Sequence, residues 1–143
     1  NLCVNARDAM SAGGTLTLSA ANVTVTDPPL DAHPPAEPGP YVCLRVTDTG
    51  IGMTAAQRDR IFDPFFTTKP LGQGTGLGLP TVLGIVRAHQ GFLRVDSGAG
   101  AGTTFEIFVP PAVARPGVAV ATAGTARRGE GELVLVVDDE QVV

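Results

Sequence analysis

The sequence predicts an α/β fold, because segments of helical periodicity alternate with segments of strand periodicity along a chain rich in turn-forming residues. Between Leu77 and His89, apolar residues recur at positions i, i+3, i+4 and i+7, the spacing of one helix face. Residues 41–48 instead alternate their side chains in the two-residue period of a strand. The 143 residues include 18 glycines and 12 prolines, so we expect many loops.

The first half of the chain predicts a helix, a strand and a long loop. Residues 1–11 form the helix, which Gly13 and Gly14 end. Residues 15–24 alternate along their length, which predicts a strand. The segment 27–40 contains six prolines, which exclude a helix or a central strand and indicate a surface loop between hairpin-like strands.

The second half continues the alternation after the strand at 41–48 and a glycine turn. Thr54 is a suitable N-cap for a short helix that ends at Ile61. A loop over residues 63–76 then leads into the helix 77–89. Two strands around a glycine-rich turn follow, at residues 92–97 and 103–109.

The composition excludes several classes of protein. Hydrophobic residues make up 43% and charged residues 17%, which excludes a chain kept disordered by its charge. The net charge of −4 excludes a strongly basic nucleic-acid binder. No apolar run reaches ~18 residues and no signal-peptide pattern is found, so we expect no membrane contact from this segment and a cytoplasmic location, in a parent protein that could itself be anchored in a membrane. Cys3 and Cys43 cannot form a disulfide framework or a four-cysteine zinc site, and we expect two buried, reduced thiols.

The composition changes beyond the last predicted strand. The chain becomes rich in Ala, Gly, Pro and Thr, which is typical of a linker. The apolar run Leu133–Val137 then predicts a strand, with Asp138 and Asp139 after it. The chain also begins at Asn1 inside a helical segment, so we expect a fragment of a longer protein. The predicted division is a domain over 1–111, a linker over 112–131 and the start of another domain over 132–143.

The first glycine motif, Asp48-Thr-Gly50-Ile-Gly52, closes a strand. One interpretation is a dinucleotide-binding pattern, in which Gly50, Gly52 and Ala55 fit G-x-G-x-x-A. A second is adenine recognition, because a carboxylate accepts hydrogen bonds from an amine and glycines let the backbone approach a flat base. A plain turn is the third interpretation.

The second glycine motif runs from Gly72 to Gly78 and leads directly into a helix. Free N–H groups at a helix N-terminus bind phosphate, so one interpretation of this motif is a phosphate site. The motif is not a Walker A loop. The alternative interpretation is a flexible loop without a ligand. Lys69, the only lysine, lies just upstream and could supply a point charge for phosphate or be a solvated side chain.

Three polar residues of the first helix, Asn1, Asn5 and Asp8, lie on roughly one face. Their oxygens suit Mg²⁺, and an exposed polar face is the alternative. The two histidines, His33 and His89, are expected to be structural or solvated.

Taken together and in order, these motifs resemble the ATP-binding catalytic domain of two-component sensor histidine kinases, of the GHKL type. The resemblance extends over residues 1 to about 110. Its four motifs are the N box at Asn1–Ala9, the first glycine box at Asp48–Gly52, the F box at Ile61–Lys69 and the second glycine box at Gly74–Leu79. The tail around Asp138 and Asp139 resembles the first strand of a receiver domain, which would make the parent a hybrid kinase; an unrelated acidic tail is the alternative.

The resemblance implies a fold and a set of site residues. The fold is a two-layer α/β sandwich (Bergerat-type), with a mixed, largely antiparallel sheet, N-terminally truncated by one strand and one helix. ATP and Mg²⁺ are the implied cofactors, held between the helices and a lid at about residues 63–76. Asn5 and Lys69 are assigned to catalysis, and Asn5 to the metal. The nucleotide-binding set is Asn1, Asn5, Asp8, Asp48, Gly50, Gly52, Gly74, Thr75, Gly76, Leu77, Gly78 and Thr103.

The implied activity is transfer of the γ-phosphoryl group of ATP to a histidine, in phosphorelay signalling. The implied partners are the protein's own histidine-containing dimerisation domain, in a homodimeric parent, and a receiver domain. We expect this chain alone to bind nucleotide weakly or not at all and to be inactive. The alternatives are a clamp-type ATPase domain of a topoisomerase, mismatch-repair protein or chaperone, and a regulatory nucleotide-binding module without transfer.

Two positions depart from the family's pattern. Many members carry a basic residue three positions after the N-box asparagine, where this chain has Asp8. Many have His-Gly-Gly after the last helix, where this chain has His89-Gln90-Gly91.

Overall fold

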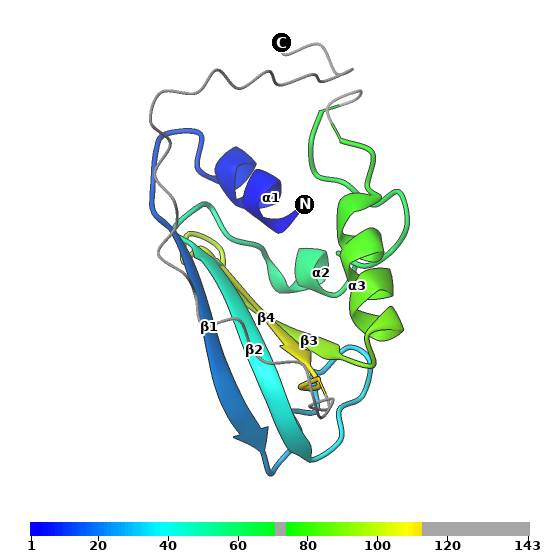
Figure 1. The fold of residues 1–143 in the computed structure, drawn as a ribbon. Helices are drawn as coiled ribbons and strands as arrows, with labels where there is room; N and C mark the ends of the chain where they lie inside the picture. The colour runs from blue at the N-terminus through cyan, green and yellow to red at the C-terminus, as the bar shows by residue number, and fades with distance from the viewer. Residues whose placement is uncertain (71–73, 113–143) are drawn as a thin grey trace, which may run out of the picture. The chain divides into compact units, whose positions relative to one another are not determined.

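An antiparallel sheet with helices on one face forms the part of the protein that the computed structural model describes, residues 1–70 and 74–112 (Figure 1). The predicted α/β fold and its antiparallel sheet are therefore confirmed. The predicted linker beyond residue 112 and the predicted receiver strand at 132–143 lie outside the described residues. In chain order the elements are α1 (Leu2–Ala9), β1 (Leu16–Val25), β2 (Gly39–Asp48), α2 (Ala55–Arg58), α3 (Gly78–Ala88), β3 (Phe92–Ser97) and β4 (Thr103–Val109).

The strand order in this sheet is β1-β2-β4-β3. Each pair of neighbouring strands is antiparallel, so the described part of the sheet lacks the mixed character that the resemblance implied. In this register Asp48, at the end of β2, lies opposite Thr103, the first residue of β4. The topology thus brings two polar residues 55 positions apart to the same edge of the sheet.

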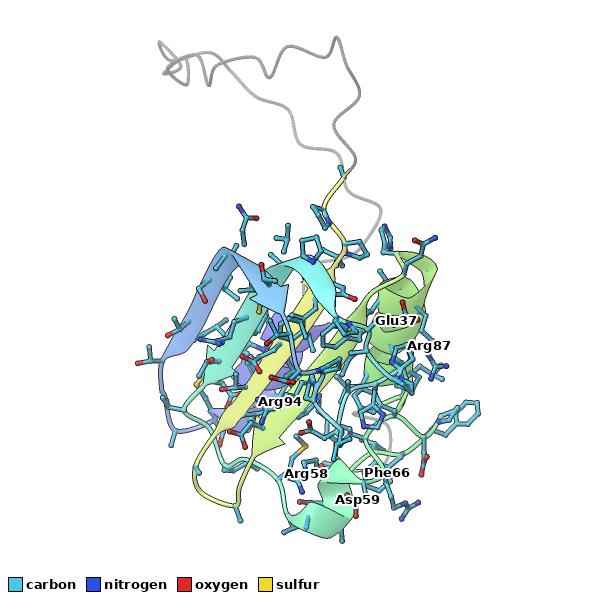
Figure 2. All side chains as sticks on the ribbon, turned by 90° about the horizontal axis from the view of Figure 1, so that it is seen from below. Glu37, Arg58, Asp59, Phe66, Arg87 and Arg94 are labelled. Atoms are coloured by element: carbon cyan, nitrogen blue, oxygen red, sulfur yellow. The ribbon has the colours of Figure 1, made fainter. Side chains whose placement is uncertain are left out.

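The core lies between α3 and the β3–β4 half of the sheet. Leu83 and Val86 of α3 pack with Leu93, Val95 and Phe105 of the strands, and Leu93 is completely buried. Because side chains alternate across a strand, the opposite face of the same strands carries charged residues. On that face Glu106 accepts hydrogen bonds from Arg45 and from Arg94, which is labelled in Figure 2.

The short helix α2 confirms the predicted N-cap. The Thr54 hydroxyl accepts the Gln57 N–H at 3.3 Å, and the Gln57 side chain accepts the Thr54 N–H at 2.8 Å. This capping box satisfies two backbone donors that the helix itself leaves free. The helix ends at Arg58, earlier than predicted, and a following turn places Ile61 in the core, where it is buried.

The proline-rich segment ends earlier than the sequence predicted. β2 begins at Gly39, so Pro40 is part of a central strand, opposite Thr24 of β1. The pairing of β2 with β4 starts only at Val42. Pro40 therefore has a strand on one side only, and its missing N–H interrupts no hydrogen bond on the other.

Strand β1 is more exposed than its alternation suggests. Leu18 is 61% exposed and Leu16 is 37% exposed, although both are on the side that faces the helices elsewhere in the sheet. Of the described helices, α3 packs over the β3–β4 half, and the core cluster that it forms there contains no residue of β1.

The prediction of two buried thiols is half wrong. Cys43 is buried in β2, whereas Cys3 is exposed on α1. The covered residues of α1 are Leu2, Asn5, Ala6 and Ala9, and Cys3 lies at the margin of this face, where it stays exposed. Burial, and secondly the nearby Glu106 carboxylate, raises the pKa of the Cys43 thiol above its usual value.

We expect the two thiols to differ widely in reactivity. At pH 8, a disulfide reagent such as DTNB should modify Cys3 rapidly and Cys43 about 10³-fold more slowly, because Cys43 becomes accessible only in transiently open molecules. Absorbance at the end of the fast phase should show one reactive thiol in the native chain, whereas two thiols should react rapidly in urea. In the matched variant Cys3→Ser, the fast phase should disappear. Equal rates for both thiols would contradict the burial of Cys43.

Candidate functional site

A cavity of about 1010 Å³ lies between α1, the segment before α3 and the paired ends of β2 and β4. It brings together residues from both ends of the described chain. The predicted site residues that line it are Asn1, Asn5, Asp8, Asp48, Gly52, Lys69, Gly74, Thr75, Gly76, Gly78 and Thr103. Two predicted site residues, Gly50 and Leu77, are not among the residues that line the cavity.

The buried end of the cavity is polar. Asp48 and Thr103 are each only 6% exposed, and they lie opposite each other in the sheet. Asp48 Oδ1 accepts the Gly50 N–H at 2.8 Å, which fixes the orientation of the carboxylate. Thr103 shares a 3.0 Å hydrogen bond with Ser97, whose hydroxyl also accepts the Met53 N–H. A carboxylate can accept several hydrogen bonds, so Asp48 retains capacity for a ligand amine.

The first glycine motif shapes this end by close backbone approach. Gly52 has a φ of +61°, and a Cβ at this position would overlap the carbonyl oxygen of Gly98. Gly50 has a different role, since a Cβ there would lie 2.6 Å from the carbonyl oxygen of Ala9. Gly50 thus lets the end of α1 approach the sheet, and the Ile51 N–H donates to the same Ala9 oxygen at 3.1 Å.

This geometry contradicts the dinucleotide-binding interpretation of the same motif. That interpretation requires a parallel βαβ unit with its glycines at the start of a helix. In the described residues the strands are antiparallel, and Thr54, after the motif, caps a four-residue helix. The motif is therefore a turn that closes one end of the cavity.

The opposite end of the cavity lies at the N-terminus of α3. Gly76 has a φ of +64°, and its carbonyl accepts the Phe65 N–H at 3.0 Å, which orders the segment before the helix. The first turn of α3 contains no acidic residue. Gly78 and Leu79 carry N–H groups there, whereas Pro80 has none, so the helix start offers one donor fewer than a typical one. Such a helix N-terminus suits an anion.

Leu77 is placed away from this site. It is the N-cap residue of α3 and is 42% exposed. Its N–H donates to the Thr75 hydroxyl at 3.3 Å. Leu77 therefore contributes to the conformation of the segment and not to the wall of the cavity.

Helix α1 places its polar residues toward the start of α3. A Cβ on Gly78 would lie 3.5 Å from Asn1 Oδ1, so the two helix N-termini are close together. Asn5 and Asp8 follow on the same side of α1 and line the cavity with Asn1. Lys69 Nζ donates to Asp8 Oδ2 at 2.5 Å. This hydrogen bond, followed by those from Arg7, lowers the pKa of Asp8 below its usual value.

The donors present fit ATP and a magnesium ion. The cavity offers a carboxylate and a hydroxyl at its buried end and a helix N-terminus with a lysine at the other. The described residues contain no cluster of three His, Cys, Asp or Glu side chains that could hold a metal. Mg²⁺ bound to a nucleotide keeps several waters and takes few protein ligands, so the amide oxygen of Asn5 is a sufficient contribution.

The predicted set of site residues did not include the apolar wall of the cavity. Arg60 lies over the ring of Phe66, with its guanidinium carbon 4.4 Å from the ring centroid. Four of the wall residues fall inside the boxes of the resemblance, so their place in these motifs was the available signal: Ile51 in the first glycine box, Ile61 and Phe66 in the F box, and Leu79 in the second glycine box. The apolar residues of the wall are Ile51, Met53, Ile61, Phe66, Leu79 and Phe105.

Neither histidine is among the residues that line the cavity. His33 packs its ring 5.2 Å from that of Phe62, and its backbone pairs with Leu93. His89 contacts the Ile85 carbonyl through Nδ1 at 2.8 Å. Across the two described ranges, no helix is both long enough and apolar enough to cross a membrane.

Comparisons with known proteins are consistent with this site. A family model described as "Histidine kinase-, DNA gyrase B-, and HSP90-like ATPase" matches residues 1–113. The sensor kinase CckA of Brucella abortus (strain 2308) is 48% identical over 110 residues, which cover 77% of this chain and 12% of that protein. The sensor histidine kinase ZraS of Escherichia coli (strain K12) is 38% identical over 115 residues, which cover 80% of this chain and 21% of that protein.

Among solved structures, the mycobacterial sensor histidine kinase MprB is similar, with a TM-score of 0.50 and 30% sequence identity. The similarity covers 68% of this chain and 57% of that one. The chain thus spans a small part of the length of the two curated relatives.

Proposed function

Because the chain belongs to the family of histidine kinase-, DNA gyrase B- and HSP90-like ATPases, we propose that it is the catalytic part of a two-component sensor histidine kinase, which transfers the γ-phosphoryl group of ATP to a histidine. The acceptor histidine belongs to a separate dimerisation domain, and a receiver domain takes part in the phosphorelay. The two sensor kinases named above favour this function over a clamp-type ATPase.

The observation that supports the proposal most strongly is the single cavity shared by Asn5, Asp48, Lys69 and the start of α3. These groups come from four segments of the chain, and each suits a different part of a nucleotide. A structural role alone would not require them to surround one cavity.

Each residue has a separate task in the proposed mechanism. When bound, ATP supplies the phosphoryl group and Mg²⁺ neutralises part of its charge. Asp48 accepts a hydrogen bond from the adenine amine, and Thr103 lies beside it at the buried end. The N–H groups of Gly78 and Leu79 orient the phosphates, and the side chains of Asn5 and Lys69 position the metal and the transferred group.

The test is labelling of the full-length protein that carries this sequence with ATP labelled in its γ-phosphate. We expect an acid-labile, base-stable label, the signature of phosphohistidine. Asn5→Ala should reduce the rate of labelling at least about 10²-fold, because it removes a ligand of the Mg²⁺ that stabilises the charge of the transition state.

The matched control is Asn22→Ala, which changes an exposed asparagine of β1 outside the cavity and should label like the wild type. Nucleotide binding without any histidine label under activating conditions would contradict the transferase and favour a regulatory module.

A further inference from the structure

The charged end of the cavity contains an ion pair that neutralises the residue expected to bind phosphate. Lys69 Nζ lies 2.5 Å from Asp8 Oδ2, and the two residues are 61 positions apart in the chain. About a third of each side chain is exposed. The pair joins the segment before α3 to helix α1 across the wall of the cavity.

The presence of a carboxylate at Asp8 does not stabilise helix α1. The residue lies in the last turn of the helix, where the helix dipole disfavours a carboxylate. Its position is explained by its partners, because its two carboxylate oxygens accept hydrogen bonds from Lys69 and Arg7.

Arg7 makes the carboxylate independent of Lys69. Its Nε and Nη2 donate to Asp8 Oδ1 at 3.0 and 2.9 Å, whereas Lys69 uses the other oxygen, Oδ2. If Lys69 moves away, Asp8 keeps a cationic partner. When Lys69 leaves Asp8 to bind another anion, the Asp8 carboxylate therefore remains paired with Arg7.

Lys69 is also next to the glycine motif. A Cβ on Gly74 would lie 3.2 Å from Lys69 Cβ and 3.3 Å from its Cδ. The backbone N–H of Lys69 donates to the Thr67 hydroxyl at 3.2 Å, which restrains the start of the side chain. The ammonium group is thus held between Asp8 and the segment that leads to the start of α3.

We propose that Asp8 competes with nucleotide phosphate for Lys69: it binds the lysine when no nucleotide is present, and Lys69 exchanges Asp8 for phosphate oxygens when a nucleotide binds. This inference rests on the function proposed above. Asp8 is then a positioning residue that acts through Lys69 and lowers the affinity for nucleotide. Asp8 takes the place of the basic residue that many family members carry here. This chain therefore has one positive charge fewer for phosphate, and a carboxylate that competes with phosphate for Lys69.

The test is a double-mutant cycle of Asp8→Asn and Lys69→Met in the full-length protein that carries this sequence, with ADP titrated by ligand-observed NMR, which measures affinities into the millimolar range. ADP is added both with Mg²⁺ and with EDTA. Asp8→Asn should strengthen ADP binding about two- to fivefold in both conditions, the effect of breaking one partly exposed ion pair. In the Lys69→Met background this gain should largely disappear.

A second measurement needs no nucleotide. Loss of the pair should speed hydrogen exchange at the Lys69 amide in free Asp8→Asn, because the segment is no longer held against α1. The matched control is Asp31→Asn, which removes a partly exposed ion pair with Arg94 outside the cavity and should leave the Lys69 amide and the ADP affinity unchanged.

The remaining outcomes separate this inference from the proposed function. Weaker ADP binding by Asp8→Asn only with Mg²⁺ would identify Asp8 as a metal ligand and overturn the exchange. An unchanged affinity, or the same gain in the Lys69→Met background, would also overturn it. Absence of ADP binding by all four forms of the full-length protein would contradict the proposed function, and the exchange with it.

Discussion

Replacing Gly52 by alanine should destabilise the domain by about 2–6 kcal/mol, the combined effect of a left-handed backbone at a residue with a side chain and of overpacking. Its φ is +61°, and the added Cβ would overlap the carbonyl oxygen of Gly98 and lie 2.8 Å from that of Gly102. Both neighbours are backbone atoms of the β3–β4 turn, so neither can move as a flexible side chain could. Chemical denaturation followed by circular dichroism measures the loss.

Two other glycines separate the causes of this effect. Gly100 has a φ of +77° and open space around it, so Gly100→Ala should cost about 1–2 kcal/mol through the backbone alone. Gly84 lies inside α3 with nothing within 4 Å, so Gly84→Ala should stabilise the domain by about 0.5–1 kcal/mol. Equal stabilities for the Gly52 and Gly100 variants would show that the turn can relax around the added atom.

Replacing Asp48 by asparagine should weaken ATP binding about 10- to 100-fold, because a hydrogen bond to a charged acceptor is replaced by one to a neutral amide. The carboxylate is 6% exposed and already oriented by the Gly50 N–H. An amide can still accept that N–H, so the fold should be preserved. The loss should therefore appear in nucleotide titrations and not in the unfolding curve.

A change of base preference tests the same contact without relying on absolute affinity. Inosine triphosphate carries a carbonyl where ATP carries the amine, and this oxygen repels the Asp48 carboxylate but can accept from an asparagine amide. Asp48→Asn should thus lower the ratio of ATP to inosine triphosphate affinity. Asp59→Asn, at the exposed C-cap of α2 and labelled in Figure 2, is the matched control and should keep the wild-type ratio. A preference unchanged in Asp48→Asn would place the base elsewhere.

Much of the fold could be predicted from local pattern. The bounds of β3 and β4 agree with the predicted strands, and Thr54 caps α2 as expected, because alternation and capping depend on neighbours in the chain. The end of α2 and the start of β2 were less accurate. At Pro40 the outcome depended on whether a second strand lay alongside, which the segment itself does not encode.

The candidate site divides in the same way. The motifs selected the residue types that suit a nucleotide, and most of those residues line one cavity. They could not separate Gly52, which lines the cavity, from Gly50, which packs against Ala9, because both glycines stand in the same motif. The sequence could not predict that Cys43 is buried and Cys3 exposed, because each outcome depends on what covers the helix or strand that carries the cysteine.

Periodicity, capping residues and glycine motifs along the chain were therefore enough to establish the kinds of elements and the chemistry they could serve. The pairing of Asp48 with Thr103 and of Asp8 with Lys69 came only from the folded arrangement. Helical and strand preferences act between residues a few positions apart. The partners of a buried carboxylate or a lysine are instead chosen by sheet register and helix packing, which bring together residues 55 and 61 positions apart.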